Sequence, residues 1–234
     1  MKGKLYGVGV GPGDADLLTL KAVEVLEKVD YICAPQTGKK EDSLALKIVQ
    51  ENINCKDKVM KLNFPMIYSK NDLNYARDVA ALKIRKKLAK GKDLAFITIG
   101  DPLLYSTYIY ILTRLNNGEF DFSIQTIPGI TSFSACMASC NLPLAKNNEN
   151  IAILPDVKDE EMLENTLKNF SNTIIMKLSK NFDKVYKILN RLQLKENTIM
   201  ASRCGHKEEA YVEDIDNLSD KDIDYLSLLI TKNN

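Results

Sequence analysis

The sequence has one histidine, five cysteines and no Cys-x-x-Cys pair among its 234 residues. An odd cysteine number is not the pattern of a disulfide framework, so we expect reduced thiols in a cytoplasmic protein. Cys136 and Cys140 fall four residues apart on a predicted helix, but two thiolates without further ligands make a weak metal site. We therefore expect packed core thiols and no protein-held metal.

Membrane and nucleic-acid signals are also missing. No segment has the roughly 18 or more consecutive apolar residues that a membrane span needs. The opening stretch MKGKLYGVGVG runs into a predicted strand without the apolar region of a signal peptide. Acidic and basic residues nearly balance, with a net charge of +1, so no overall field attracts nucleic acid or an anionic membrane. We expect neither as a partner.

Two nucleotide-binding fingerprints are absent. The P-loop motif GxxxxGK[ST] does not occur. The glycine-rich stretch from Gly7 to Asp14 follows a predicted strand but fails the GxGxxG spacing, because Pro12 or Asp14 stands where a glycine is needed. The second predicted strand ends in Pro35 instead of an acidic residue that would bind a ribose. These features exclude NAD, although alternating glycines still predict close approach of a ligand to the backbone.

Strands and helices alternate along the chain. Strands are predicted over 4–10, 31–34, 59–62, 94–99, 122–127, 151–154, 173–176, 198–201, 210–212 and 225–230. Helices are predicted over 16–28, 43–51, 73–88, 105–115, 131–140, 160–169 and 182–192. We predict an α/β fold with two α/β domains, 1–127 and 128–234, the first sheet mostly parallel and the second mixed because strands outnumber helices there.

The stretch from Asp93 to Thr107, DLAFITIGDPLLYST, is the most informative segment. Its apolar run predicts a strand buried on both faces, and Gly100-Asp101-Pro102 ends it before a helix expected from Tyr105. In an open parallel sheet, ligands bind outside the carboxyl ends of the strands. Asp101 is therefore placed to contact a small molecule.

Two more loops follow predicted strands. Pro65 ends the strand at 59–62, and the neighbouring Phe64, Met66 and Tyr68 either tuck beneath their own loop or line a large, flat, apolar ligand. Farther on, Pro128-Gly129 makes a turn before a helix. Its Thr131 and Ser132 hydroxyls cap that helix, contact a ligand, or do both.

Four stretches taken together carry a family resemblance. They are GVGVGPGDADLLTLKA (7–22), FPM (64–66), IGDPLLYST (99–107) and PGITSFSA (128–135). In order and spacing they resemble the tetrapyrrole methylase family, the class III S-adenosylmethionine-dependent methyltransferases, over nearly the whole chain. The last three stretches resemble the branch that methylates C20 of precorrin-2 or of its cobalt form.

The resemblance implies a homodimer in which S-adenosylmethionine binds in a cleft between two α/β domains. The residues that would bind the cofactor are Pro12, Gly100, Asp101, Leu104, Thr131, Ser132, Met176 and Gly205. Those that would bind the tetrapyrrole are Gly11, Asp14, Phe64, Met66, Tyr68, Lys177, Arg203 and His206. For Arg203 and His206, surface charge near a turn is an equal alternative. His206 either contacts a cobalt ion carried by the substrate or has no such role.

One departure from the family pattern concerns catalysis. Relatives that methylate uroporphyrinogen carry an aspartate in the position of Pro35, so a general base is absent there and we nominate no catalytic residue. Alignment of carbon, methyl and sulfur would supply about 7–11 kcal/mol instead. The alternatives are a metal-free precorrin-2 substrate, a diphthine synthase-like or ribosomal-RNA methylase, and a non-catalytic binding module.

Overall fold

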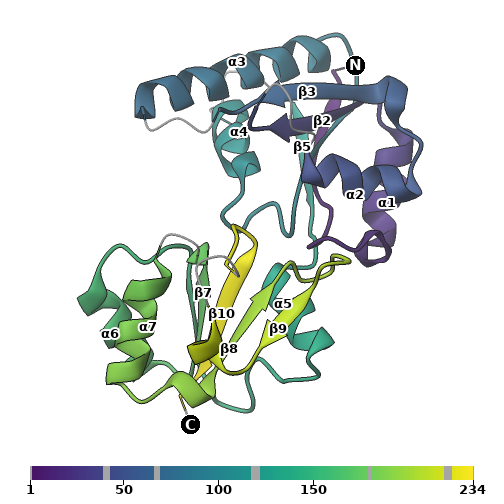
Figure 1. Cartoon of the computed structure of the whole chain (residues 1–234). Coiled ribbons are helices and arrows are strands. Elements are labelled where there is room, and N and C mark those ends of the chain that lie inside the picture. The colour runs from purple at the N-terminus through teal and green to yellow at the C-terminus, as the bar shows by residue number, and fades with distance from the viewer. Residues whose placement is uncertain are drawn as a thin grey trace. The chain divides into compact units, whose positions relative to one another are not determined.

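The protein folds into two compact units, Met1–Thr131 and Ser132–Asn234 (Figure 1). This computed structural model describes residues 2–38, 43–65, 69–116, 122–178, 181–218 and 223–233. The division between the units falls four residues later than the domain boundary expected at 127/128, immediately before a helix that begins at Ser132. Among the described residues, no helix is both long and apolar enough to cross a membrane.

The first unit is built on a five-stranded sheet in which every neighbouring pair is parallel, as predicted. Its strand order is β3-β2-β4-β1-β5. The elements are β1 (Lys4–Gly9), η1 (Ala15–Leu17), α1 (Leu20–Lys28), β2 (Tyr31–Gln36), α2 (Leu44–Asn52), η2 (Lys56–Lys58), β3 (Val59–Asn63), α3 (Lys70–Leu88), β4 (Leu94–Thr98), α4 (Thr107–Leu115) and β5 (Ser123–Ile127). β4 is central, and all five of its residues are buried. The prediction that this strand is covered on both faces is confirmed.

Helices cover both faces of this sheet (Figure 1). α1 and α2 bury their apolar sides in one core cluster with β1 and β2, whereas α3 and α4 form a second cluster around Phe96. α1 begins where the Thr19 hydroxyl accepts the Ala22 N–H at 3.1 Å, so Thr19 rather than Asp16 is its cap. Capping and an apolar stripe together account for this helix.

α4 starts at Thr107, two residues later than predicted. Tyr105 has φ +50°, in the left-handed region, and therefore cannot be part of the helix. The buried Ser106 hydroxyl donates to the Pro102 carbonyl and closes the loop immediately before the helix. Residues 100–106 are thus a folded loop rather than the first turn of a helix.

Gly7 makes room for an aromatic side chain. A Cβ added at Gly7 would lie 2.1 Å from Cζ of Tyr108, which is fully buried, packs against Phe96 and shares a hydrogen bond with Thr126. The expectation that every alternating glycine admits a ligand is therefore wrong at Gly7. Its missing side chain is replaced by the Tyr108 ring.

We expect Gly7→Ala to destabilise the protein by about 1–3 kcal/mol, because the Tyr108 ring must move within a packed core. Denaturant unfolding followed by circular dichroism measures this loss. Adding Tyr108→Leu should recover part of it, giving a coupling energy of about 0.5–3 kcal/mol in a double-mutant cycle. Strictly additive effects would show that the ring and the added methyl do not compete.

The second unit contains a mixed sheet, which confirms that prediction. Its strand order is β6-β7-β10-β8-β9, with β6 parallel to β7 and the other pairs antiparallel. The elements are α5 (Ser132–Ser139), β6 (Ile151–Leu154), α6 (Glu160–Asn169), β7 (Asn172–Met176), α7 (Phe182–Arg191), η4 (Lys195–Asn197), β8 (Thr198–Ser202), β9 (Ala210–Val212), η5 (Ile215–Asn217) and β10 (Ser227–Lys232). α6 and α7 bury their apolar sides against β7, β8 and β10.

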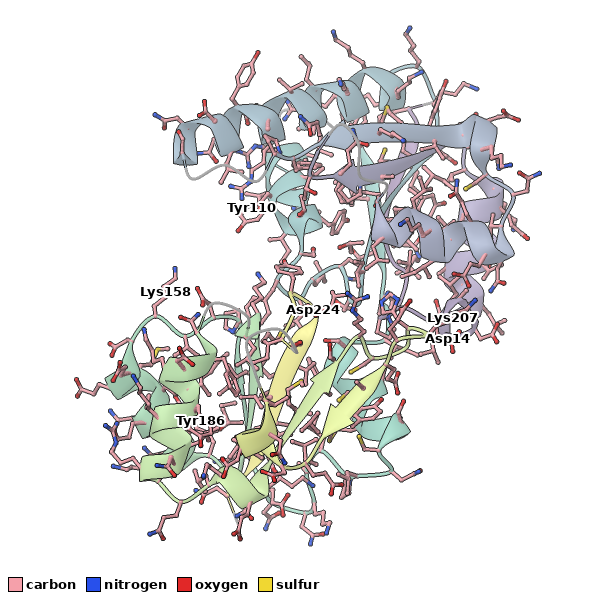
Figure 2. All side chains as sticks on the ribbon, in the orientation of Figure 1. Asp14, Tyr110, Lys158, Tyr186, Lys207 and Asp224 are labelled. Atoms are coloured by element: carbon pink, nitrogen blue, oxygen red, sulfur yellow. The ribbon has the colours of Figure 1, made fainter. Side chains whose placement is uncertain are left out.

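The last strand begins two residues later than predicted. Asp224 accepts the Leu226 N–H at 2.7 Å, and its own N–H donates to the Ser227 hydroxyl at 3.0 Å. These bonds hold residues 224–227 in a turn, so Tyr225 is 60% exposed instead of lying in the sheet. The turn places Asp224 directly before β10 at the edge of the sheet (Figure 2).

Candidate active site

The carboxyl ends of β1, β4 and β5 meet through their backbones. These strands are parallel neighbours, so the loops that follow them leave the same edge of the sheet. A Cβ added at Gly9 would lie 2.5 Å from the Gly100 carbonyl oxygen and 2.6 Å from the Gly129 nitrogen. Neighbouring backbone atoms therefore occupy the space beside Gly9, and the expectation that a ligand enters this space is wrong. We call the contact of Gly9, Gly100 and Gly129 the three-glycine contact.

Asp101 ties two of these loops together. One carboxylate oxygen accepts the Leu103 N–H at 2.8 Å and the other accepts the Gly129 N–H at 3.1 Å. The side chain is half-buried, and each carboxylate oxygen retains a further lone pair. Asp101 thus holds the loop after β4 against the loop after β5 while it can still accept from a ligand.

The loop after β4 combines buried and exposed groups. Gly100 is buried and has φ +66°, in the left-handed region that favours glycine. This backbone conformation, rather than crowding around an added Cβ, is what requires glycine here. Leu103 and Tyr105 are 54% and 46% exposed, while Leu104 is half-buried and donates its N–H to the Asp101 carbonyl at 3.4 Å. The loop therefore presents two large apolar side chains to solvent beside a fixed carboxylate.

The loop after β1 is bonded to the same group of strand ends. Gly11 has φ +76°, and its carbonyl accepts the Gly100 N–H at 2.8 Å. Pro12 is buried beside it. Asp14 is exposed and accepts the Asp16 N–H at 2.8 Å, which caps η1. Gly11, Pro12, Gly100 and Asp101 are thus brought together, whereas the contact seen for the Asp14 side chain is a local cap.

The predicted apolar loop after β3 is described only in part. Phe64 is 9% exposed and packs edge-on against Phe96, with ring centroids 6.2 Å apart. Its observed contacts are those of a core residue. Met66 and Tyr68 lie outside the described residues.

Thr131 and Ser132 flank the division between the two units. α5 begins at Ser132, directly after Thr131, and both side chains are half-buried. Their place at the start of a helix agrees with capping and leaves the binding role as a proposal.

In the second unit, the remaining predicted residues gather at one edge of the sheet. Leu228 of β10 pairs with Met176 of β7 and with Ala201 of β8, so the ends of β7 and β8 flank the start of β10. Lys177 follows β7 with φ +54° and Arg203 follows β8 with φ +53°. Left-handed conformations of such residues are uncommon and concentrate at functional sites. No sequence pattern predicts these left-handed conformations at Lys177 and Arg203.

Arg203 is held in place by acidic neighbours. Its Nε donates to Asp224 at 2.6 Å, and its Nη1 lies 3.9 Å from Glu208. His206 lies in the next turn, and its backbone N–H donates to the Arg203 carbonyl at 2.9 Å. The buried ring Nε2 of His206 has no hydrogen-bond partner among the described residues. An unpartnered buried nitrogen is available to a ligand. Asp224 was not among the predicted site residues.

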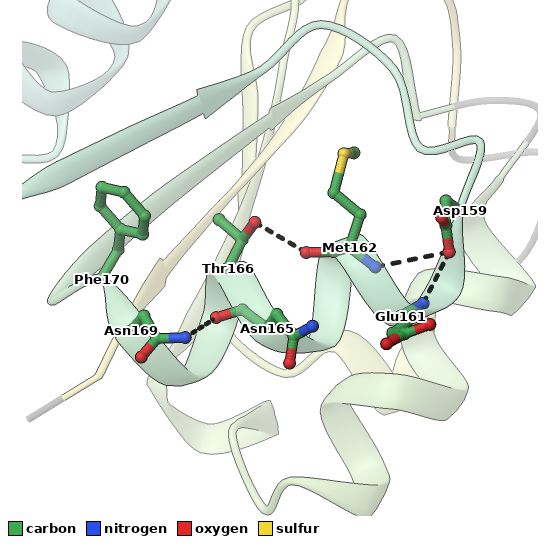
Figure 3. A pocket seen from close by; sticks show the side chains of 7 residues that line it. All are labelled: Asp159, Glu161, Met162, Asn165, Thr166, Asn169 and Phe170. Atoms are coloured by element: carbon green, nitrogen blue, oxygen red, sulfur yellow. Dashed lines mark hydrogen bonds between the residues drawn. The ribbon is translucent and has the colours of Figure 1, made fainter.

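Two other features lie apart from these residues. An open pocket of about 440 Å³ runs along α6, from Asp159 to Phe170 (Figure 3). Two of its polar side chains are used within the helix, since Asp159 caps the first turn and Thr166 donates to the Met162 carbonyl. No predicted site residue lines it. Within the described part of the chain, no three His, Cys, Asp or Glu side chains form a group that could hold a metal ion.

Comparison with known proteins gives long matches. The family model described as Tetrapyrrole (Corrin/Porphyrin) Methylases matches residues 4–218. The chain is 38% identical to the probable cobalt-precorrin-2 C(20)-methyltransferase of Methanocaldococcus jannaschii, covering 98% of this chain and 96% of the relative. It is 31% identical to the cobalt-precorrin-2 C(20)-methyltransferase of Salmonella typhimurium, covering 87% and 85%. It is 30% identical to the precorrin-2 C(20)-methyltransferase of a Sinorhizobium species, covering 97% and 94%.

Solved structures share the fold. A cobalt precorrin-4 methyltransferase, CbiF, has a TM-score of 0.75 at 18% identity, covering 98% of this chain and 94% of the other. A uroporphyrin-III C-methyl transferase from Thermus thermophilus, solved in complex with S-adenyl homocysteine, has a TM-score of 0.66 at 18% identity, covering 98% and 97%. With the family model and the sequence relatives, these matches agree with the α/β architecture described above. The chain belongs to the tetrapyrrole (corrin/porphyrin) methylase family.

Proposed function

We propose that this protein transfers a methyl group from S-adenosylmethionine to C20 of cobalt-precorrin-2, or of its oxidised form cobalt-factor II, in cobalamin biosynthesis. The observation that carries the proposal is the similarity, over 98% of the chain, to a relative named as a cobalt-precorrin-2 C(20)-methyltransferase. Metal-free precorrin-2 is the second candidate, because the Sinorhizobium relative is named for that substrate. We further propose a cytoplasmic homodimer.

The residues present fit a sulfonium cofactor. S-adenosylmethionine supplies a methyl group already activated by positive sulfur, and it carries an ammonium group and a ribose diol that need acceptors. Asp101 offers a fixed carboxylate with spare lone pairs. At Gly100 the backbone leaves space in the direction that a side chain would take. We assign Pro12, Leu104 and Thr131 to the same cofactor surface. Ser132, Met176 and Gly205 of the second unit would supply further contacts.

The tetrapyrrole substrate combines a large apolar ring with several carboxylates. We assign its ring to the first unit, to the loops at Gly11–Asp14 and at 64–68. Lys177, Arg203 and His206 would bind the carboxylates, and the Asp224 contact holds the Arg203 guanidinium ready for a bidentate pair. In the first unit, Phe64 would act by holding its loop on the Phe96 ring.

Catalysis in this proposal is positioning. The C20 meso carbon of the reduced ring is enamine-like; it forms the new bond to the methyl carbon as the methyl–sulfur bond breaks, and C20 then loses a proton. Fixed loops that align the reacting atoms can supply about 7–11 kcal/mol. No residue is assigned as the base.

An anaerobic substrate comparison tests this function. In separate incubations, purified protein and S-adenosylmethionine carrying a ¹³C-methyl group are mixed either with metal-free precorrin-2 or with its cobalt complex. We expect one methyl gained, a ¹³C resonance at C20 and faster turnover of the cobalt form. Faster turnover of the metal-free ring would select the second candidate. Methylation of neither ring, with no S-adenosylhomocysteine binding, would refute both.

A further inference from the structure

The loop between β8 and β9 is folded by its own backbone. The His206 N–H donates to the Arg203 carbonyl at 2.9 Å, and the Glu209 N–H donates to the His206 carbonyl at 3.0 Å. Two successive turns therefore carry the chain from Arg203 to Glu209. Arg203 and Gly205, both in the first turn, have positive φ values of +53° and +79°, a conformation that glycine adopts readily and that is uncommon for arginine.

The Glu209 carboxylate holds this loop from within the second unit. One oxygen accepts the Gly205 N–H and the other accepts the Tyr211 hydroxyl of β9. The Ser139 hydroxyl of α5 hydrogen-bonds the same carboxylate. One side chain thus joins a loop amide, a strand and a helix.

Electrostatics indicate that Glu209 stays ionised in this position. Burial alone acts to raise the pKa of its carboxyl, but the hydrogen bonds from Tyr211, Gly205 and Ser139 hold that pKa below its ordinary value. Burial, followed by the hydrogen bond to Glu209, raises the pKa of Tyr211, so the phenol stays protonated and continues to donate. The adjacent Glu208 is a surface residue, 69% exposed in its side chain.

We propose that Glu209 is a positioning residue, which fixes the Gly205 amide and so sets the turn that presents Arg203 and His206 to the ligands. This inference rests on the proposed function, because the ligands of that turn are S-adenosylmethionine and the tetrapyrrole. Glu209 itself contacts neither ligand. Its removal therefore weakens binding while leaving the chemical step nearly unchanged.

The test compares Glu209→Gln with a matched control, Glu213→Gln, a few residues farther along. Glu213 is an exposed carboxylate beyond β9 and belongs to no assigned site. Glutamine has one acceptor oxygen where glutamate has two, so it cannot accept from both the Gly205 N–H and the Tyr211 hydroxyl. One charge-assisted hydrogen bond is therefore lost. We expect about a tenfold rise in the Kd of S-adenosylhomocysteine and in KM, with kcat within about threefold of wild type. Glu213→Gln should change none of these values.

A second variant and a structural readout keep the test decisive. Tyr211→Phe removes one donor and leaves the carboxylate, so we expect a rise in Kd of about threefold or less. Amide hydrogen exchange measures the loop directly, and Glu209→Gln should lower protection of the Gly205 amide.

A lower Tm with unchanged Kd and KM would reduce Glu209 to a structural residue and overturn the inference. If wild-type protein binds S-adenosylhomocysteine but Glu209→Gln binds it equally well, only this inference fails. If wild-type protein binds neither ligand, the proposed function fails too.

Discussion

Replacing Asp101 by alanine is expected to lower S-adenosylhomocysteine affinity and methyl-transfer rate by about 100-fold. The carboxylate accepts the Leu103 and Gly129 amides, and both bonds are lost together. Hydrogen bonds to a charged group stabilise a fold by about 1.5–3 kcal/mol each, so without them the loops must be ordered again when the ligand binds. A cost of about 3 kcal/mol for that ordering corresponds to about two decades in affinity. Calorimetric titration and initial rates measure the two effects.

Asp101→Asn separates the two roles of this side chain. An asparagine oxygen can still accept one amide, so if Asp101 acts mainly by joining the loops, Asn should retain about tenfold more affinity than Ala. If its charge mainly contacts the cofactor ammonium, Asn should bind as weakly as Ala. Asp57→Ala, at an exposed site before β3, is the control. Wild-type behaviour of Asp101→Ala would remove the residue from the site.

Gly129→Ala is expected to damage both the stability and the activity of the protein severely. Its Cβ would lie 2.2 Å from the Gly100 carbonyl oxygen and 2.8 Å from the Gly9 Cα, and backbone atoms cannot rotate away as a side chain can. We expect a loss of about 3 kcal/mol or more in stability and at least a 100-fold loss of activity. Thermal unfolding and initial rates measure this.

Gly38→Ala provides the matched control for that variant. Among the described residues, a Cβ at Gly38 would meet no atom within 4 Å, so the stability and activity of Gly38→Ala should stay near wild type. If Gly129→Ala melted within a degree or two of Gly38→Ala, the three-glycine contact would have to be looser than its geometry indicates.

Local sequence patterns predicted most of the fold because they depend on neighbouring residues. β6 and α6 have the predicted bounds, since an apolar run and an Asp159 cap are both local features. The start of α4 was misplaced because the left-handed conformation of Tyr105 leaves no trace in composition. Family resemblance, not periodicity, singled out Pro12 and Met176.

Long-range contacts account for what the sequence did not reveal. Gly7 was interpreted as an opening for a ligand, yet its space is filled by Tyr108, about a hundred positions away along the chain. The contact between Asp101 and Gly129 likewise joins two loops that only the strand order brings together. Glu209 and Asp224 were not predicted as site residues, because only their hydrogen-bond partners distinguish them from other acidic residues.

The three-glycine contact also separates positions that tolerate substitution in these loops from positions that do not. Main-chain atoms have no alternative rotamers, so peptide geometry sets how closely these three loops approach one another at the contact. Leu103 and Tyr105, on the loop after β4, are 54% and 46% exposed and are not among the three glycines of this contact. We therefore expect substitutions at these two exposed positions to change the surface of the loop while the backbone contact stays in place.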